Sequence, residues 1–305
     1  MNLIHRFCGL FVLVSSTPRY WEYNEMLQRF VNRSIPLPAD SWSLHPNFSR
    51  STTPLETFRF QGQHGEDQLI LTIFNDKQDG FFLDLAAHAW KLISNTFVLE
   101  HFNNWRGICI EANPIYIEGL LAHRKCMVFK SVVGERSDEK VYFDFKSHDR
   151  KIGGVIGGIV GEHFDNHDNR SAVAQTTVSL EKLLEFARAP AIIDYFSLDV
   201  EGAEFFVMKR FPFNRFTFLT LTVERPTKLL HQLLALNGYA FVKEITGNRF
   251  GECLYVHKSL HNFNLVVHKY HQAEIVPSWF GEKRPYLLHP KLVFFSINLT
   301  NSIRE

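Results

Sequence analysis

The sequence predicts an α/β protein with a mostly parallel sheet, and three observations carry this prediction. Gly80 to Ala87 (GFFLDLAA) is apolar on both sides of one carboxylate, as expected of a central strand buried on both faces. From there to Lys258, strand-like apolar runs alternate with helix-like patterns, which is typical of strand–helix–strand units. The chain has 305 residues, 45% of them hydrophobic, which is enough for one large core with appendages or for two small domains.

Charge and composition exclude some classes of protein. The net charge is +1, from 33 basic and 32 acidic residues, and no block of Lys and Arg gathers anywhere in the sequence. Because nucleic-acid phosphates require a concentrated basic face, no nucleic-acid partner is expected. The 15 histidines are scattered along the chain, so no metal site is expected either.

The four cysteines, Cys8, Cys109, Cys126 and Cys253, are too few and too widely spaced for a disulfide scaffold. Cys109 and Cys253 fall inside predicted strands and Cys126 begins another, so buried free thiols are expected. A bridge between Cys109 and Cys126, on neighbouring strands, is the alternative if the protein is secretory.

Residues 1–16 resemble a signal peptide. His5 and Arg6 precede an apolar run from Phe7 to Val14, which is too short to span a bilayer but suits a signal core. The alternative is an ordinary N-terminal strand or helix. A signal would place the protein in the secretory pathway or outside the cell, without a stable membrane span; otherwise it is expected in the cytoplasm.

Four Asn-x-Ser/Thr sequons could accept N-linked glycans in the secretory pathway, although chance alone would supply some of them: Asn32, Asn47, Asn169 and Asn298.

Residues 17–60 lack periodicity and form a predicted loop-rich lead-in to a domain over residues 61–260. The domain begins with QGQHGEDQLILTIF, an amphipathic helix pattern. Its first acids, Glu66 and Asp67, suit the positive end of the helix dipole. The alternative is functional, with Gln63, Glu66 and Asp67 over the mouth of the first strand.

Strands and helices then alternate in a regular order. The predicted strands are Phe81–Leu85, Arg106–Ala112, Met127–Val133, Lys140–Phe145, Ile192–Val200, Phe216–Glu224, and a closing hairpin of Tyr239–Ile245 and Cys253–Lys258. The predicted helices are Thr96–Phe102, Ile115–His123, Glu181–Ala187, Ala203–Arg210 and Lys228–Asn237. Ser94 or Asn95 caps the first helix, Pro114 fits the first turn of the second, and Gly238 ends the last. Residues 261–305 are expected to pack on the domain as an extension.

Acids end four of these strands: Asp84, Glu111, Asp199 and Glu224. Ligands of open α/β sheets bind beyond the carboxyl ends of the strands, so these acids indicate a site. Glu111 follows Asp84 at the strand–helix–strand offset at which an acid binds ribose hydroxyls. The alternative for Asp84 is a structural hydrogen bond to the following turn.

The segment Lys151–Gly161 (KIGGVIGGIVG) contains five glycines but does not join a strand to a helix, as a phosphate-binding loop would. It is interpreted as a mobile flap over the site or as a surface loop.

The order of motifs resembles the FkbM family of S-adenosylmethionine-dependent methyltransferases. The motifs are GEDQLIL, GFFLDLAA, SNTFVLE, GICIEANP, VSLEKLL, IDYFSLDVEGAE and TVERP. The resemblance covers residues 61–258. It implies the Rossmann-like class I fold, a seven-stranded, mostly parallel sheet of order 3-2-1-4-5-7-6 with helices on both faces.

The resemblance also implies the residues that bind the S-adenosylmethionine cofactor. Asp84 and the following backbone would lie against its methionine end, Glu111 would bind the ribose hydroxyls, and the segment Ser131–Val133 would flank the adenine. The full expected set is Gln63, Glu66, Asp84, Ala86, Ala87, Glu111, Ser131 and Val132.

The implied reaction is O-methylation of a glycan or small-molecule hydroxyl. Methyl transfer is an in-line displacement, so the enzyme chiefly positions the two reactants. A carboxylate can take the hydroxyl proton, and the candidates are, in order, Asp199, Glu201 and His88.

The first loop departs from the family's Asp-x-Gly-Ala-x-x-Gly pattern. Ala86 replaces the first glycine, and His88, Ala89 and Trp90 fill the remainder. Since glycine permits positive φ and close approach of a ligand, a catalytically inactive binding or scaffold protein is the alternative. A nucleotide-sugar or dinucleotide enzyme is disfavoured, because DLAAHA stands where a Gly-x-Gly-x-x-Gly turn would be required.

Overall fold

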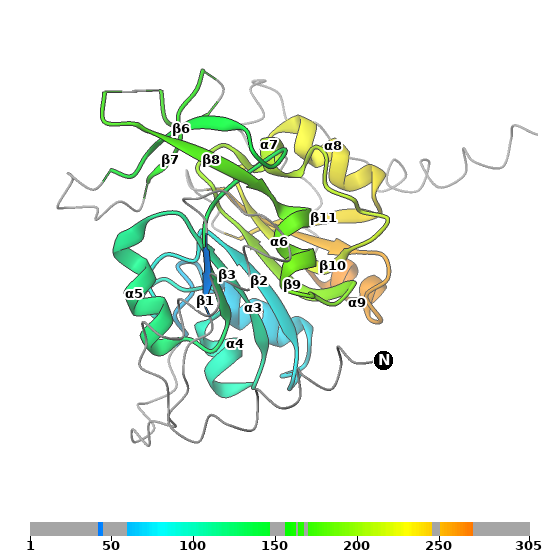
Figure 1. Ribbon diagram of the computed structural model, residues 1–305. Helices are drawn as coiled ribbons and strands as arrows, with labels where there is room; N and C mark the ends of the chain where they lie inside the picture. The colour runs from blue at the N-terminus through cyan, green and yellow to red at the C-terminus, as the bar shows by residue number, and fades with distance from the viewer. Residues whose placement is uncertain are drawn as a thin grey trace, which may run out of the picture.

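The computed structural model describes residues 42–44, 60–146, 156–162, 164–167, 170–245 and 251–270. Its centre is an eight-stranded sheet in the order β1-β4-β3-β2-β9-β10-β12-β11 (Figure 1). The strands are β1 (Trp42–Leu44), β2 (Phe81–Leu85), β3 (Arg106–Glu111), β4 (Met127–Lys130), β9 (Ile192–Leu198), β10 (Thr217–Glu224), β11 (Tyr239–Glu244) and β12 (Glu252–His257). The α/β class is thereby confirmed.

The prediction of a seven-stranded sheet is wrong by one strand. β1 pairs antiparallel with β4 and adds an eighth strand at that edge, so the order differs from the expected one. The sheet is mixed, since β12 also runs antiparallel to both of its neighbours. The lead-in carries no alternating pattern, which is why the sequence does not predict β1.

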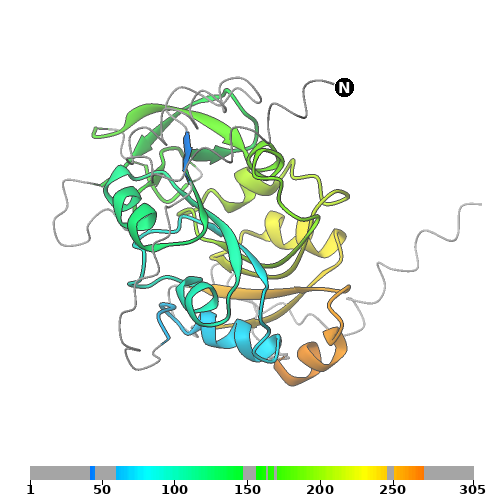
Figure 2. The same ribbon diagram turned by 60° about the horizontal axis from the view of Figure 1, so that its bottom comes forward.

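Two apolar cores lie on opposite faces of this sheet, because successive strand residues point to opposite sides. On β2, Leu83 and Leu85 belong to one core and Phe82 to the other. The first core is covered by α6 (Leu180–Phe186), α7 (Glu204–Met208) and α8 (Lys228–Leu236). The second is covered by α3 (Glu66–Ile73), α4 (Phe97–Phe102), α5 (Pro114–His123) and α9 (Phe263–Tyr270). Figure 2 shows helices on both faces.

The predicted third strand is divided in two. β4 ends at Lys130, and after Ser131 the chain enters β5 (Val132–Gly134), which leaves the main sheet. β5 joins a smaller sheet of order β5-β8-β6-β7, with β6 (Lys140–Asp144), β7 (Gly158–Ile159) and β8 (Val173–Ser179). This sheet lies beside the carboxyl ends of the main strands (Figure 1).

Cys109 and Cys126 form a disulfide, with their Cα atoms 5.9 Å apart. The expectation of buried free thiols is therefore wrong for these two residues, and the alternative bridge is present. Cys253 is free and buried, as expected. The bridge joins β3 to the residue before β4 and closes a short loop around α5.

We expect loss of this bridge to lower the free energy of unfolding by about 3 kcal/mol, because the 17-residue separation restricts the unfolded chain by that order. Denaturant unfolding of Cys109→Ala/Cys126→Ala measures the loss. A reductant serves as the control. It should lower the free energy of unfolding of the wild type and of Cys253→Ala, and it should not change that of the double variant. A wild-type curve unaffected by complete reduction would contradict the expectation.

Several predicted segments lie outside the described residues. They are the signal-like segment 1–16, the four sequons, the first part of the glycine-rich segment, and residues 271–305. Among the helices that the structure describes, every one is too short or too polar to traverse a bilayer.

Candidate functional site

A pocket opens at the carboxyl ends of β2, β3 and β9, with about 970 Å³ of empty space that is in part open to solvent. Ten of the eleven predicted site residues line it: Gln63, Asp84, Ala86, Ala87, His88, Glu111, Ser131, Val132, Asp199 and Glu201. Glu66 does not. Its carboxylate accepts a hydrogen bond from the His64 backbone N–H (2.9 Å) and is buried at the start of α3.

Asp84 lies at the floor of the pocket and is 3% exposed. Its Oδ2 accepts a hydrogen bond from the Thr96 hydroxyl at 2.5 Å. In register it faces Cys109 on β3 and Ser197 on β9. Burial raises the pKa of Asp84, while the positive charge of Arg124 and the Thr96 hydrogen bond oppose that rise.

Glu111 is held by two backbone donors at the end of β3. Its Oε2 accepts from the His88 N–H (2.8 Å) and its Oε1 from the Asn113 N–H (2.6 Å). Burial nevertheless raises the pKa of Glu111 to about 7. The carboxyl group lines the pocket and can accept further hydrogen bonds, most strongly when it is ionised.

The loop after β2 contains strained backbone. Ala86 has φ of 68° and His88 of 53°, in the left-handed region that glycine adopts freely. The N–H groups of Ala86 and Ala87 both donate to the Ile110 carbonyl (2.9 and 3.1 Å), which fixes the turn against β3. Although Ala86 and His88 are not glycines, the loop keeps the left-handed backbone that glycine adopts freely. Each of these two residues lowers the stability of the fold by about 1–2 kcal/mol.

Sequence reasoning missed several residues of the wall. The Tyr116 ring lies 4.0 Å from the His88 ring, between centroids, and Asn113 caps α5 with its side chain. The missed residues include Ile93, Asn95, Asn113, Tyr116, Phe143 and Ser197. The only signal for them was their position after strands β2 and β3, in β6 or near the end of β9.

Gly157, Gly158 and Ile159 of the glycine-rich segment also line the pocket, and Gly158 and Ile159 form β7. A Cβ on Gly158 would lie 2.6 Å from the Asn166 side chain and 3.2 Å from Glu201, so the close fit requires glycine there. Within the described part of the segment, Gly158 and Ile159 thus form a short strand of the pocket wall, whereas the sequence predicts a mobile flap over the site or a surface loop.

An acidic cluster follows β9 and β10. The Arg225 Nη2 contacts Asp165 (2.6 Å), Glu224 (2.7 Å) and Glu201 (2.9 Å). Glu224 is also hydrogen-bonded to Asp199. The guanidinium thus contacts three acids, and Glu224 connects them to Asp199. The sequence indicates Asp199 and Glu224 as separate strand ends and Glu201 as a candidate base, and it gives no signal for Asp165.

Burial and neighbouring carboxylates raise the pKa values of this cluster, to about 7 for Glu201 and about 11 for Glu224. Burial raises the pKa of Asp199 as well, while the hydrogen bond from Glu224 and the positive charge of Arg225 oppose that rise. The Oδ1 of Asp199 is buried and has no hydrogen-bond partner among the described residues. It is free to accept a proton from a group in the pocket.

We expect the ligand-free protein to become less stable as pH rises from 5 to 8. Burial raises the pKa to about 7 for Glu66, Glu111 and Glu201 and to about 8 for Glu204. A glutamate whose pKa is higher in the folded state stabilises the fold fully at pH values below its pKa in the unfolded chain, which is near 4.5. This contribution to the free energy of unfolding is lost as the pH rises through the pKa of the folded state. Melting temperatures across this range measure the slope.

Glu111→Gln should flatten that slope, because one of the four titrations is removed, while substitution of the exposed Glu118 should leave it unchanged. A melting temperature that rises steadily from pH 5 to 8 would contradict the raised pKa values.

The comparison with protein families gives one match: residues 84–240 match the model of the methyltransferase FkbM domain. This is just over half of the chain and spans the main sheet from β2 to the start of β11. No curated protein and no solved structure matches the chain.

Proposed function

The chain belongs to the FkbM methyltransferase family, and from this premise we propose that it transfers the methyl group of S-adenosylmethionine to a hydroxyl group of a glycan or other small molecule. The observation that carries the choice of cofactor is the charge of the pocket. Four carboxylates line it, from Asp84, Glu111, Asp199 and Glu201, and no Lys or Arg is among the described lining residues.

An acidic pocket of this kind favours a cationic ligand with hydroxyl groups and disfavours one with phosphates. S-adenosylmethionine carries a sulfonium, an ammonium, one carboxylate and a ribose diol, and its net charge is positive. A dinucleotide or a nucleotide sugar would bring its phosphates against these carboxylates without a basic partner. The four carboxylates of the pocket therefore fit the proposed cofactor and argue against the nucleotide-sugar alternative.

When bound, S-adenosylmethionine supplies an electrophilic methyl group. Glu111 is the residue proposed to bind the ribose hydroxyls, since its ionised carboxylate accepts hydrogen bonds. Ser131 and Val132, where the chain leaves β4 for β5, are proposed to flank the adenine. Asp84, beneath the turn of Ala86 and Ala87, is proposed to face the methionine end.

The base proposed for the acceptor hydroxyl is Asp199. It lines the pocket, and its Oδ1 accepts no hydrogen bond from the described residues. The hydrogen bond from Glu224 favours the ionised form of Asp199, against the effect of burial. Taking the hydroxyl proton as the new bond forms would make the oxygen a better nucleophile, while the pocket holds both reactants in line.

A label-transfer assay tests the proposal. Full-length protein is incubated with methyl-labelled S-adenosylmethionine and neutral glycans or small alcohols, and the labelled product is treated with mild alkali. A methyl ether keeps the label, whereas a methyl ester on a carboxylate releases it as methanol. Label released by alkali would contradict hydroxyl methylation. Cofactor binding without any transfer would favour the inactive binding protein.

We also propose that the protein passes through the secretory pathway. The Cys109–Cys126 bridge supports this, because disulfides persist in oxidising compartments and are rare in the cytosol. Detection of glycan or signal cleavage on the protein from its native source would test it.

A further inference from the structure

We propose that Arg124 is a positioning residue of the methyl-donor site, which clamps both ends of the strained loop between Asp84 and Trp90. The inference rests on the proposed function, because the loop matters through the cofactor that it would hold. Arg124 stands two residues before the disulfide and lines no part of the pocket itself.

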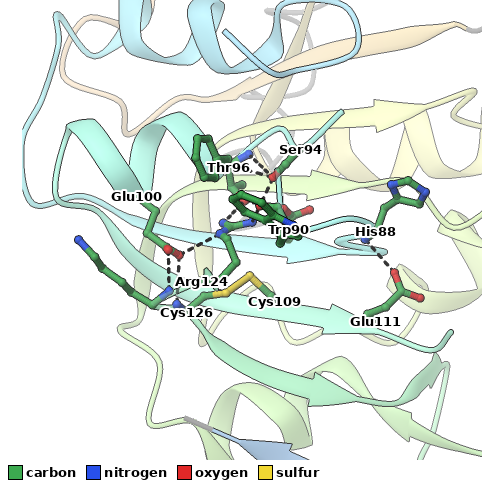
Figure 3. Close-up of a disulfide and its surroundings, with 12 residues drawn as sticks. His88, Trp90, Ser94, Thr96, Glu100, Cys109, Glu111, Arg124 and Cys126 are labelled. Carbon is green, nitrogen blue, oxygen red and sulfur yellow. Dashed lines mark hydrogen bonds and ion pairs between the residues drawn. A yellow bond between two sulfur atoms is a disulfide. The ribbon is translucent and has the colours of Figure 1, made fainter. Parts of the chain in front are cut away.

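The guanidinium of Arg124 is fully buried, at 0% exposure. Its acceptors are Glu100 Oε2 (3.3 Å), Ser94 Oγ (3.1 Å), Thr96 Oγ1 (2.8 Å) and the Trp90 carbonyl (3.4 Å). Figure 3 shows the guanidinium between these residues, beside the disulfide. Three of its four acceptors thus belong to the segment that follows the loop, residues 90–96.

One end of the loop is fixed through Thr96. Arginine has donors only, so the Thr96 hydroxyl must accept from Arg124 and use its own proton elsewhere. That proton is donated to Asp84 Oδ2 at 2.5 Å. The relay from guanidinium through hydroxyl to carboxylate holds Asp84 in one orientation at the end of β2.

The other end is fixed at Trp90, whose carbonyl accepts from Arg124. The Trp90 ring stacks on His123, with centroids 4.2 Å apart, and would touch a Cβ at Gly119. Between the two fixed ends lie Ala86 and His88, both with positive φ. Strained backbone persists only where contacts with the surrounding structure hold it in place. The hydrogen bonds from Arg124 to Thr96 and to the Trp90 carbonyl provide such contacts at the two ends of the loop.

Arg124 is itself held from two sides. Glu100 on α4 accepts from the N–H groups of Lys125 (2.6 Å) and Cys126 (3.0 Å), and so fastens the turn that carries Arg124. The disulfide ties Cys126 to Cys109, which is the β3 residue in register with Asp84. A buried ion pair is a weak source of stability, so positioning is the better account of this one.

Calorimetric titration with S-adenosylhomocysteine tests the inference. Thr96→Val keeps the shape of the side chain but removes the relay, and should weaken binding about tenfold or more. Thr96→Ser retains the hydroxyl and should bind within about threefold of wild type. Arg124→Gln should lose at least as much as Thr96→Val, and Ala86→Gly should restore part of that loss, because glycine removes the strain that the clamp opposes.

The matched control is Lys77→Met, which removes the ion pair with Asp194 at the opposite end of β9. It should not change affinity. If folded Thr96→Val binds like wild type, or Lys77→Met loses as much, the inference is overturned although the proposed function stands. If folded wild type does not bind at all, the proposed function itself fails.

Discussion

Replacement of Glu111 by Ala is expected to weaken binding of S-adenosylmethionine and S-adenosylhomocysteine by at least about 100-fold. Each hydrogen bond from a ribose hydroxyl to this carboxylate is worth about 1.5–3 kcal/mol, and two are expected. The variant also removes the acceptor of the His88 and Asn113 N–H groups, which shape the pocket floor. Calorimetric titration of both ligands measures the loss.

Two further variants make this result specific. Glu118→Ala changes an exposed glutamate on α5, the helix that follows β3, and should bind like wild type. Glu111→Gln keeps the size of the side chain but not its charge, and should lose most of the affinity. Cofactor binding that survives in folded Glu111→Ala would contradict the assignment of this carboxylate to the ribose.

Asp199→Asn is expected to lower kcat by about 10²–10⁴, with cofactor affinity within a few-fold of wild type. The amide cannot take the hydroxyl proton, yet it fills the same space beside Glu224. Rates of methyl transfer to the best acceptor from the labelling assay measure the effect, and titration with S-adenosylhomocysteine measures the affinity.

The control for this variant is Asp194→Asn, at the opposite end of the same strand, where the carboxylate pairs with Lys77 at 2.7 Å. It should lower stability and leave kcat unchanged. An unchanged kcat in Asp199→Asn would exclude this residue as the base and direct attention to Glu201, whose carboxylate lies on the same pocket wall.

The strand ends could be predicted from the sequence because an apolar run that contains a single acid near its end is typical of a buried strand that leads into a site. Parallel strands bring their carboxyl ends to one edge, so Asp84, Glu111 and Asp199 are expected to lie near one another. The structure places all three in the lining of one pocket. Their hydrogen-bond partners could not be predicted, since backbone donors such as the His88 N–H carry no sequence pattern.

Other features left no readable signal. A single arginine after a helix, such as Arg124, looks like a surface residue until its burial is known. Ser131 lies inside an apolar run, so the division of the third strand there was hidden. Glu66 does not line the pocket, because its carboxylate accepts a hydrogen bond from the nearby His64 N–H, a contact that no sequence pattern reveals.

A crystal structure of the protein grown with S-adenosylhomocysteine would locate the cofactor site. We expect ligand density in the pocket at the ends of β2, β3 and β9, with the ribose hydroxyls within hydrogen-bond distance of Glu111 and the sulfur facing Asp199. Density for the ligand elsewhere, or a ribose that does not contact Glu111, would contradict this expectation.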